Sequence, residues 1–280
     1  MPEKGDVMNP WIRISTVLSV FVITVAGVPA WAQFTEEELA QRPTIETFLV
    51  NAEIVDSKQL GQAEGVTRPY KLTLREGSIQ HDALWKNPSG RMGGFIEGWK
   101  YEIAAYNLDK FLGLNMVPPT AERRFHGNLG SINFWVDVWI DGRKKQEEKI
   151  AVPGPKLVNW NRMTYLQRAF DNLIGNEDRH LGNVLITEDW RMYLIDHSRS
   201  FRTTKAYTNK LQFDKKKPMK RLPRAFVEKI KGLDEATLRS VVGDTLTDKE
   251  IEAVMARQQL MLAEFDRLLS EEGEDAFLYD

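Results

Sequence analysis

Three oxygen-bearing side chains stand close together in the second half of the chain. The stretch NEDRHLGNVL, residues 176–185, places Asp178 five positions before Asn183, and Asp196 follows in YLIDHSRSF. Carboxylate and amide oxygens are ligands for a hard divalent cation, and a carboxylate beside such a site can deprotonate a hydroxyl. The same residues also suit a polar turn that caps the end of a helix. Both interpretations stay open at this point.

Phosphoryl transfer from a nucleotide also needs a cationic side chain on the phosphates and backbone that covers them. Lys86 ends an expected strand, and Glu102, 16 residues later, lies in an expected helix where it can pair with the lysine ammonium. The alternative is an ordinary surface ion pair. Gly61 and Gly65 lie in a turn between two earlier strands, where backbone amides can face phosphate. The first half of the chain therefore offers candidates for nucleotide binding.

His180 and His197 raise the alternative of a zinc site. The chain has 0 Cys and no HExxH motif, and carboxylate and amide oxygens suit Mg²⁺ or Mn²⁺ better than zinc. The sequence therefore favours a hard cation.

The elements that must position these residues change character along the chain. The first half is rich in alternating and β-branched residues, which predicts strands. Between the third and fourth strands, apolar residues recur at helical spacing until Gly113 and a Pro pair stop them. The expected strands cover residues 47–56, 68–77, 81–87 and 132–140, and the expected helix covers residues 98–114.

The second half is mainly helical. Residues 161–175 form an expected amphipathic helix that ends at Gly175, and several helices are expected between residues 224 and 270. A short hairpin over residues 184–196 would bring Asp196 back toward the loop that carries Asp178. A charged stretch closed by Pro and Gly, residues 142–156, is typical of a connector.

This order of elements and motifs resembles the atypical protein-kinase-like family. The resemblance extends to phosphatidylinositol 3- and 4-kinases, with their DRHxxN loop, and to HipA-type kinases, but NEDRH and IDHSRSF are most similar to the secretory-pathway (Golgi) kinases. It covers about residues 45–270. The resemblance implies an α+β bilobal fold with a small, mainly β N-lobe containing one helix (45–150) and a larger, mainly helical C-lobe (151–280), after an N-terminal extension (33–44).

The resemblance also implies a role for each candidate residue. Asp178 would be the catalytic base, Asn183 and Asp196 would bind Mg²⁺ or Mn²⁺, and ATP would be the nucleotide. Lys86 would bind the α- and β-phosphates and Glu102 would orient it. The candidates are Asp178, Arg179 and His180 for catalysis, Lys86, Glu102, Gly61 and Gly65 for nucleotide binding, and Asn183 and Asp196 for metal. Two departures are visible, since Ser198 replaces a common Gly and residues 60–69 are not GxGxxG.

Composition limits the partners. The 280 residues are 42% hydrophobic and 28% charged, which indicates a globular chain, and 38 basic against 40 acidic residues give no overall reason to expect nucleic-acid binding. A local basic run could bind an anionic substrate or a phospholipid headgroup, although such runs are usually solvated. Its residues include Lys215, Lys216, Lys217, Lys220 and Arg221.

The first 32 residues have the pattern of a secretory signal peptide. An uncharged apolar run at residues 14–28 is short for a membrane-spanning helix, and Ala30 and Ala32 give the small-x-small pattern of a cleavage site. Cleavage after Ala32 would export the protein to the periplasm, the extracellular space or a secretory lumen. Without cleavage, the run would act as a membrane anchor.

The sequence thus predicts an exported, metal-dependent kinase-like phosphotransferase that moves phosphate from ATP to a hydroxyl of a protein, lipid or sugar. One alternative is a pseudokinase that uses the same fold as an extracytoplasmic binding module. Another is a metal-dependent phosphohydrolase that uses the same carboxylates without nucleotide.

Overall fold

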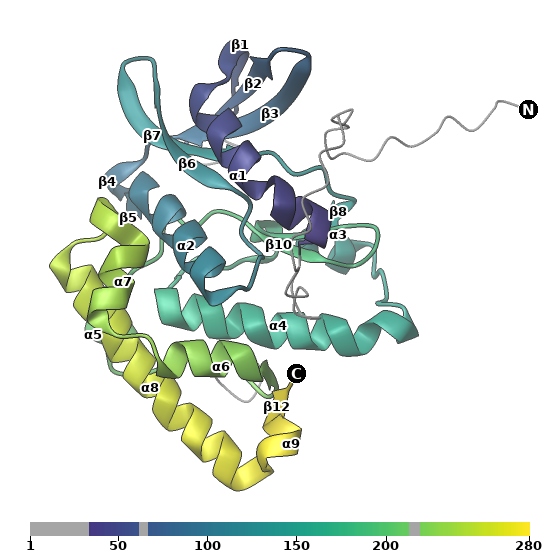
Figure 1. Cartoon of the computed structure of the whole chain (residues 1–280), viewed down its shortest axis with the longest axis vertical. Helices are drawn as coiled ribbons and strands as arrows, with labels where there is room; N and C mark the ends of the chain where they lie inside the picture. Colours follow the sequence, from purple (N-terminus) through teal and green to yellow (C-terminus); the bar gives the residue numbers. More distant parts are fainter. Residues whose placement is uncertain (1–33, 62–66, 213–218) are drawn as a thin grey trace, which may run out of the picture.

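The computed structural model describes residues 34–61, 67–212 and 219–280 (Figure 1). The expected signal peptide at residues 1–32, Gly65 and Lys215 to Lys217 lie outside these ranges. Within them, no helix is both long and apolar enough to cross a membrane.

The N-terminal part is built on a five-stranded antiparallel sheet with the order β1-β2-β3-β7-β6. Leu72, Leu74 and Ala83 from this sheet are fully buried in its core. The turn between β1 and β2 begins beside Gly61, where the Leu60 amide donates to the Pro69 carbonyl at 2.8 Å. The strands are β1 (Glu53–Gln59), β2 (Tyr70–Glu76), β3 (Ile79–Lys86), β6 (Thr120–Phe125) and β7 (Asn128–Phe134).

Helix α1 (Glu36–Asn51) packs against β6 and β7. The strand predicted for residues 47–56 is therefore wrong for residues 47–51, and β1 begins only at Glu53. A capping box starts the helix, because Thr35 accepts from the Glu38 amide and Glu38 accepts from the Thr35 amide. The buried Ile45, Phe48 and Leu49 then follow helical spacing, which overrides their strand-like composition. Residue 45, the expected start of the first lobe, lies inside this helix.

Two further parts of the N-terminal region differ from the expectation. A short hairpin, β4 (Ser89–Met92) with β5 (Phe95–Gly98), precedes α2 and was not predicted. The strand predicted at 132–140 ends at Phe134, because the chain leaves the sheet there and crosses to β8 (Ile140–Asp141) in a second, three-stranded sheet. Residues 135–139, which include Trp135 and Trp139, are not part of a strand.

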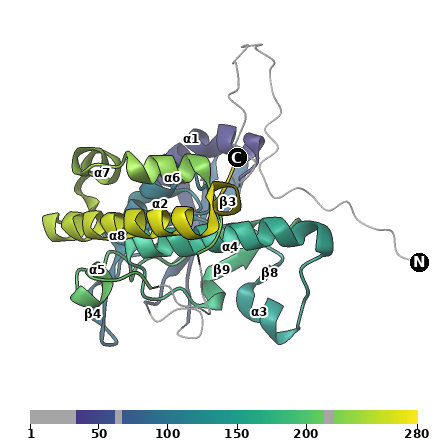
Figure 2. The same cartoon turned by 90° about the horizontal axis from the view of Figure 1, so that it is seen from below.

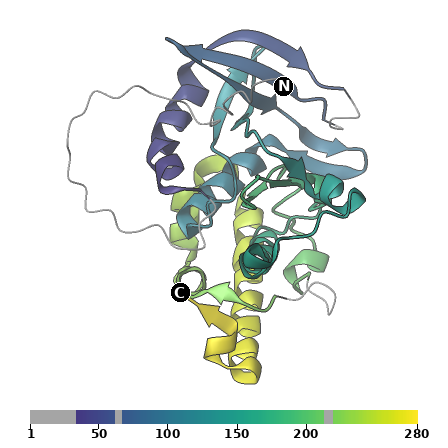
Figure 3. The ribbon, with the colours of Figure 1, turned by 90° about the vertical axis from the view of Figure 1, so that its right-hand side faces the viewer.

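Helix α2 (Trp99–Leu112) forms where the sequence predicted a helix and ends at Gly113, whose φ of 75° is left-handed. It contacts β6 and β7 on one side and α7 on the other. Figures 1 and 3 show the five-stranded sheet at one end, most of the helices at the other and α2 between them. The helix therefore joins the two parts of the molecule.

The C-terminal part is mainly helical, and its core is made by α2, α4, α6, α7 and α8. Figure 2 shows α8 lying along α4. Helix α4 begins at Gly154 rather than at residue 161, so the expected connector contains both α3 and the first turn of α4, where Pro155 suits the helix start. The helices are α3 (Gly142–Glu147), α4 (Gly154–Ile174), α5 (Lys205–Thr208), α6 (Arg224–Lys231), α7 (Glu235–Val242), α8 (Asp248–Glu272) and α9 (Glu274–Phe277).

Short elements complete the C-terminal part. The predicted hairpin is present as β9 with β10, and β8 joins it to make the three-stranded sheet. A parallel pair, β11 with β12, holds the C-terminal end of the chain against the start of α6. These elements are β9 (Val184–Ile186), β10 (Met192–Leu194), β11 (Leu222–Pro223), β12 (Leu278–Tyr279) and the 3₁₀ helices η2 (Leu181–Asn183) and η3 (Gly243–Thr245).

Candidate functional site

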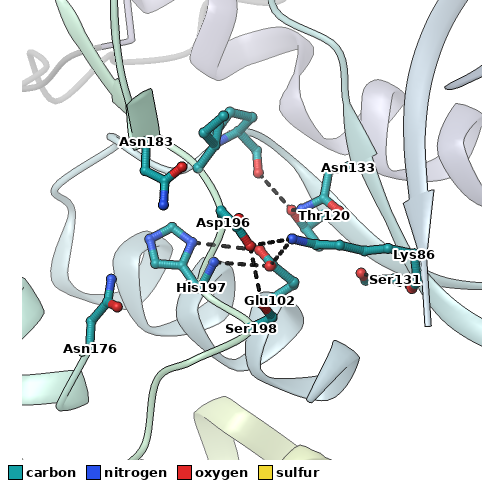
Figure 4. A network of polar contacts seen from close by, with 12 residues as sticks. Lys86, Glu102, Thr120, Ser131, Asn133, Asn176, Asn183, Asp196, His197 and Ser198 are labelled. Atoms are coloured by element: carbon teal, nitrogen blue, oxygen red, sulfur yellow. Dashed lines mark hydrogen bonds and ion pairs between the residues drawn. The ribbon is translucent and has the colours of Figure 1, made fainter. Parts of the chain in front are cut away.

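Lys86 and Glu102 form a buried ion pair, and the partly exposed Asp196 joins them in a charged cluster between the two parts of the molecule (Figure 4). The Lys86 Nζ lies 2.5 Å from Glu102 Oε1 and 2.7 Å from Asp196 Oδ1. Lys86 comes from the end of β3, Glu102 from the first turn of α2, and Asp196 follows β10. The Lys86 and Glu102 side chains are 5% and 1% exposed, whereas that of Asp196 is 42% exposed. The surface-pair alternative is therefore wrong.

The charges of this cluster stabilise one another. Burial alone would raise the pKa of Asp196, but Lys86 holds the pKa of this carboxyl far below its usual value. Burial alone would also raise the pKa of Glu102, but Lys86 again lowers it. Burial would lower the pKa of Lys86, but the two carboxylates raise it. All three side chains are therefore charged at neutral pH.

The loop that carries Asp178 starts directly after α4, which ends at the left-handed Gly175. The Asn176 side chain donates to Asp171 Oδ1 at 3.0 Å and accepts from the Asp178 amide at 2.9 Å. Asp171 belongs to the last turns of α4. The end of α4 therefore fixes the position of the Asp178 backbone.

Arg179 points into the protein and holds the loop together. Its guanidinium pairs with Asp171 at 3.1 Å and donates to the backbone carbonyls of Asn183 at 2.9 Å and Ile195 at 2.7 Å. His180 is exposed, and its Nδ1 accepts from the Gly182 amide at 3.1 Å at the start of η2. In this geometry both side chains shape the loop.

Asn183 and Asp196 are brought together by the backbone. The Ile195 amide donates to the Asn183 carbonyl at 3.2 Å, and the Asn183 side chain donates to the Asp178 carbonyl at 3.1 Å. Asp196 has a φ of 60°, a left-handed conformation that is strained for a residue with a Cβ. Figure 4 shows Asn183 and Asp196 in one group of polar side chains. The loop after α4 and the β9–β10 hairpin therefore position both candidate metal ligands.

The chemistry of these donors fits Mg²⁺ or Mn²⁺. Asp196 Oδ1 accepts from Lys86 and lies 3.1 Å from Ser198 Oγ, whose single proton also faces Glu97, while Asp196 Oδ2 has no donor in the part of the chain that the structure describes. That same part contains no group of three His, Cys, Asp or Glu residues suited to a metal. A cation held by Asp196 and the Asn183 amide oxygen would need further oxygens, and nucleotide phosphates and water supply these in kinase-type sites.

His197 faces the interior and is fully buried. Its Nε2 lies 2.8 Å from Arg179, and its backbone amide donates to Glu102 at 2.9 Å. Burial lowers the pKa of His197, so the ring is neutral. His197 therefore packs on the interior side of the site, where it contacts Arg179 and Glu102, and it does not face the candidate metal ligands.

Two residues at the site were missed by the sequence analysis, Glu97 and Arg199. Arg199 pairs with Glu97 at 2.6 Å and with Asp178 at 3.2 Å. Glu97, which is 3% exposed, also accepts from Ser198 Oγ at 2.6 Å. The isolated Glu in GGFIEGWK and the Arg in IDHSRSF were visible in the sequence, but nothing local showed that they meet. Together they connect Asp178 with the segment that carries Asp196.

Other candidates lie apart from this network. Gly61 lies at an exposed position at the start of the β1–β2 turn. Of the basic run, Lys220 is exposed, and Arg221 donates to the Asp275 carbonyl at 3.2 Å. The neighbouring Arg224 pairs with Glu274 and Asp280. The described end of the basic run therefore binds the C-terminal segment of the chain.

Comparisons with known proteins identify the fold. No family model matches the chain. Protein Rv2133c of Mycobacterium tuberculosis is 28% identical over an alignment of 144 residues, and the match covers 41% of this chain and 48% of that protein, about half the length of this curated relative.

Solved structures match over most of the chain. Hydra Fam20, solved with sugar, has a TM-score of 0.61 and 15% identity and covers 90% of this chain and 95% of its own. The Golgi casein kinase has a TM-score of 0.60 and 13% identity, with 89% and 80% covered. The same kinase with Mn/ADP bound has a TM-score of 0.59 and 14% identity, also with 89% and 80% covered. The predicted α+β kinase-like fold is confirmed.

Proposed function

We propose that the protein is a metal-dependent phosphotransferase that moves the terminal phosphate of ATP to a hydroxyl of a protein, lipid or sugar. The observation that carries this proposal is the buried Lys86–Glu102 pair in contact with Asp196. A lysine bound by two carboxylates is a fixed cation, and a fixed cation beside a metal-binding carboxylate suits the phosphates of a nucleotide.

In the proposed reaction, Asp178 accepts the proton of the acceptor hydroxyl. The hydroxyl oxygen forms a bond to the γ-phosphorus, the bond from that phosphorus to the β–γ bridging oxygen breaks, and ADP leaves. Lys86 binds phosphate oxygens, and Asp196 and Asn183 hold Mg²⁺ or Mn²⁺. The cation supplies charge neutralisation on the phosphates. Arg199 orients Asp178, and Arg179 and His180 keep the loop in shape.

The solved neighbours support the choice of ligands. The Golgi casein kinase was solved with Mn/ADP and hydra Fam20 with sugar. Both have the fold of this chain, so a nucleotide with a divalent cation and a hydroxyl-bearing acceptor are the first ligands to test. The apolar run and the Ala30-x-Ala32 pattern support export.

A thermal-shift titration tests nucleotide binding first. A ligand that binds only the folded state raises the melting temperature, so ATP with Mn²⁺ or Mg²⁺ is expected to raise it and EDTA to abolish the rise. Asp196→Ala should remove the metal dependence. An unchanged melting temperature with every nucleotide tested would contradict the proposal.

Asp178→Ala then separates binding from catalysis. This variant should keep the ATP-induced shift and lose phosphate transfer, measured as ADP formation with candidate acceptors, by at least about a hundredfold. Retained transfer would show that another group is the base. Binding without transfer in the wild type with every acceptor class would indicate a pseudokinase, and hydrolysis of phosphate esters without nucleotide would indicate a phosphohydrolase.

A further inference from the structure

A cavity of about 410 Å³ lies beside the loop that carries Asp178, on the side of α3. Its wall combines α3 with the start of η2, strand β9 and the first half of α4, and Figure 2 shows α3 and β9 on the same side of α4. Side chains in the wall include Lys145, Lys149, Ile150, Trp160, Leu181 and Ile186. The volume is within the range of ligand pockets and is large enough for a bulky apolar side chain.

Two lysines give this cavity a positive edge. Lys145 and Lys149 are four positions apart, so they lie on the same side of α3 and the turn that follows it. Neither has a carboxylate within ion-pair distance among the residues that the structure describes. Their neighbours are paired instead, Arg143 with Asp141 and Lys144 with Glu148. The two unpaired ammonium groups are therefore available to an anionic ligand.

Apart from Gln146, the side chains in the rest of the wall are apolar or aromatic. The Lys145 ammonium lies 5.5 Å from the centre of the Trp160 ring and 5.9 Å from that of Trp190, so two indole rings hold it in place. In the wall, Leu181 is 44% exposed, and outside it Trp139, which packs against Trp190 at 5.8 Å, is 42% exposed. The ligand that fits must bury an apolar group and place negative charge next to it.

The cavity lies close to the candidate base. Leu181 follows Asp178 by three residues, and three residues span at most ~11 Å of chain. Helix α3 touches this loop directly, because a Cβ on Gly142 would lie 2.8 Å from the Leu181 carbonyl oxygen. If one group of a ligand occupies the cavity, neighbouring groups of the same ligand can therefore reach Asp178.

We propose that this cavity docks a polypeptide substrate through a bulky apolar side chain flanked by Asp or Glu residues, a few positions from the hydroxyl that is phosphorylated. The inference rests on the proposed function and names a protein as its acceptor. Charge complementarity and the apolar wall favour this occupant. A nucleic acid is a poorer match, because Glu147 and Glu148 interrupt the basic residues along α3.

A peptide-binding experiment tests the docking site without catalysis. The labelled full chain is applied to an array in which one serine is fixed and acidic, basic and apolar residues are permuted around it. Peptides with an apolar residue flanked by Asp or Glu should be retained, and their affinity, measured by fluorescence anisotropy, should fall with added salt. Retention of no peptide, or only of basic or wholly polar peptides, would overturn the inference.

Charge reversal localises the binding. Lys145→Glu/Lys149→Asp should weaken the best peptide at least about tenfold, whereas Lys144→Glu, on the solvent side of α3, should not. Asp is chosen at position 149 because it tolerates the left-handed φ of 52° better than most residues. Equal binding by the double variant and the control would contradict the inference, provided that both melt at the wild-type temperature.

Measuring ATP binding in parallel distinguishes failure of the docking site from failure of the proposed function. The double variant should keep the ATP-induced thermal shift, and with the selected peptide it should raise KM with kcat unchanged. An ATP shift without peptide binding would refute the docking site alone. Peptide binding without any ATP shift would refute the phosphotransferase and leave a peptide-binding module.

Discussion

The Lys86 ammonium and the Glu102 carboxylate, 2.5 Å apart, form a buried ion pair that joins the last residue of β3 to the first turn of α2. Asp196 contacts the same ammonium at 2.7 Å. The three side chains therefore hold β3, α2 and the segment after β10 around one cation, and they couple the stability of the fold to the candidate phosphate-binding group.

Replacing this lysine tests both roles. Lys86→Met should abolish the ATP-induced thermal shift and lower the free energy of unfolding by about 3 kcal/mol, because Glu102 would remain buried without its partner. Urea denaturation measures the second effect. Adding Glu102→Gln to Lys86→Met should recover part of the lost stability but no nucleotide binding. A double variant that is less stable than Lys86→Met would contradict this account of the pair.

Arg199 is expected to position Asp178. Its guanidinium bridges Asp178 and the buried Glu97, so Arg199→Gln should lower kcat about tenfold and change the ATP-induced shift little. Arg199→Lys should recover only part of the activity, because an ammonium lacks the planar fork that binds two carboxylates. Arg239→Gln, which removes an exposed arginine paired with Glu235 on α7, is the matched control. Unchanged kcat in Arg199→Gln would exclude the positioning role.

The order of the elements was readable in the sequence, because helical spacing and glycine stops reflect local backbone preferences. Helix α2, the end of α4 at Gly175 and the β9–β10 hairpin formed where they were expected, and with them Lys86 came to face Glu102 and Asp196. Helix α1 was missed although its Thr35-x-x-Glu38 capping box was visible, since the β-branched residues near its end also suit a strand.

The contact of Glu97 with Arg199 was beyond local patterns. The two residues are 102 positions apart and meet only because the β4–β5 hairpin packs on the segment after Asp196. Further contacts fix that packing, including the bond from the Gly98 amide to the Ser198 carbonyl at 2.9 Å. Such pairings depend on tertiary packing, which a short window of sequence does not contain.

Asp109 should make stability fall as pH rises. It is fully buried on α2, and burial raises the pKa of its carboxyl from 3.8 to about 7, although the Met116 amide donates to it at 2.9 Å. The folded state thus binds this proton more tightly than the unfolded state, so the stability that Asp109 contributes declines between pH about 4 and about 7 and then levels off, whereas the contribution of the buried His197, whose pKa is lowered, rises with pH below about 6.5. The difference in urea midpoint between the wild type and Asp109→Asn across this range measures the decline, because His197 contributes equally to both proteins.

The carboxylates of Glu102 and Asp196 do not obscure this effect. Lys86 lowers the pKa values of Glu102 and Asp196 against the effect of burial, so the stability that they contribute is present above about pH 4 and is lost only as pH falls further. Their window lies below that of Asp109. An identical pH dependence in the wild type and Asp109→Asn would show that Asp109 is ionised in the folded state throughout.

Gly175 should be far less tolerant of substitution than another helix-ending glycine, Gly232. Gly175 has a φ of 59°, and a Cβ at this position would lie 2.8 Å from Arg257 Cζ. The Arg257 guanidinium is buried and donates to the Leu173 carbonyl at 2.8 Å. Gly175→Ala should therefore lower the free energy of unfolding by about 2 kcal/mol or more.

Gly232→Ala is the matched control for Gly175→Ala, because Gly232 has a helical φ of −84° and its nearest neighbour to a new Cβ is 3.5 Å away. The change there should be within about 0.5 kcal/mol or slightly stabilising. Since Gly175 directly precedes the loop that carries Asp178, Gly175→Ala should also lower phosphate transfer at temperatures where the protein remains folded. Equal unfolding free energies for the two alanine variants, measured in urea, would refute the close approach of Arg257 to the end of α4.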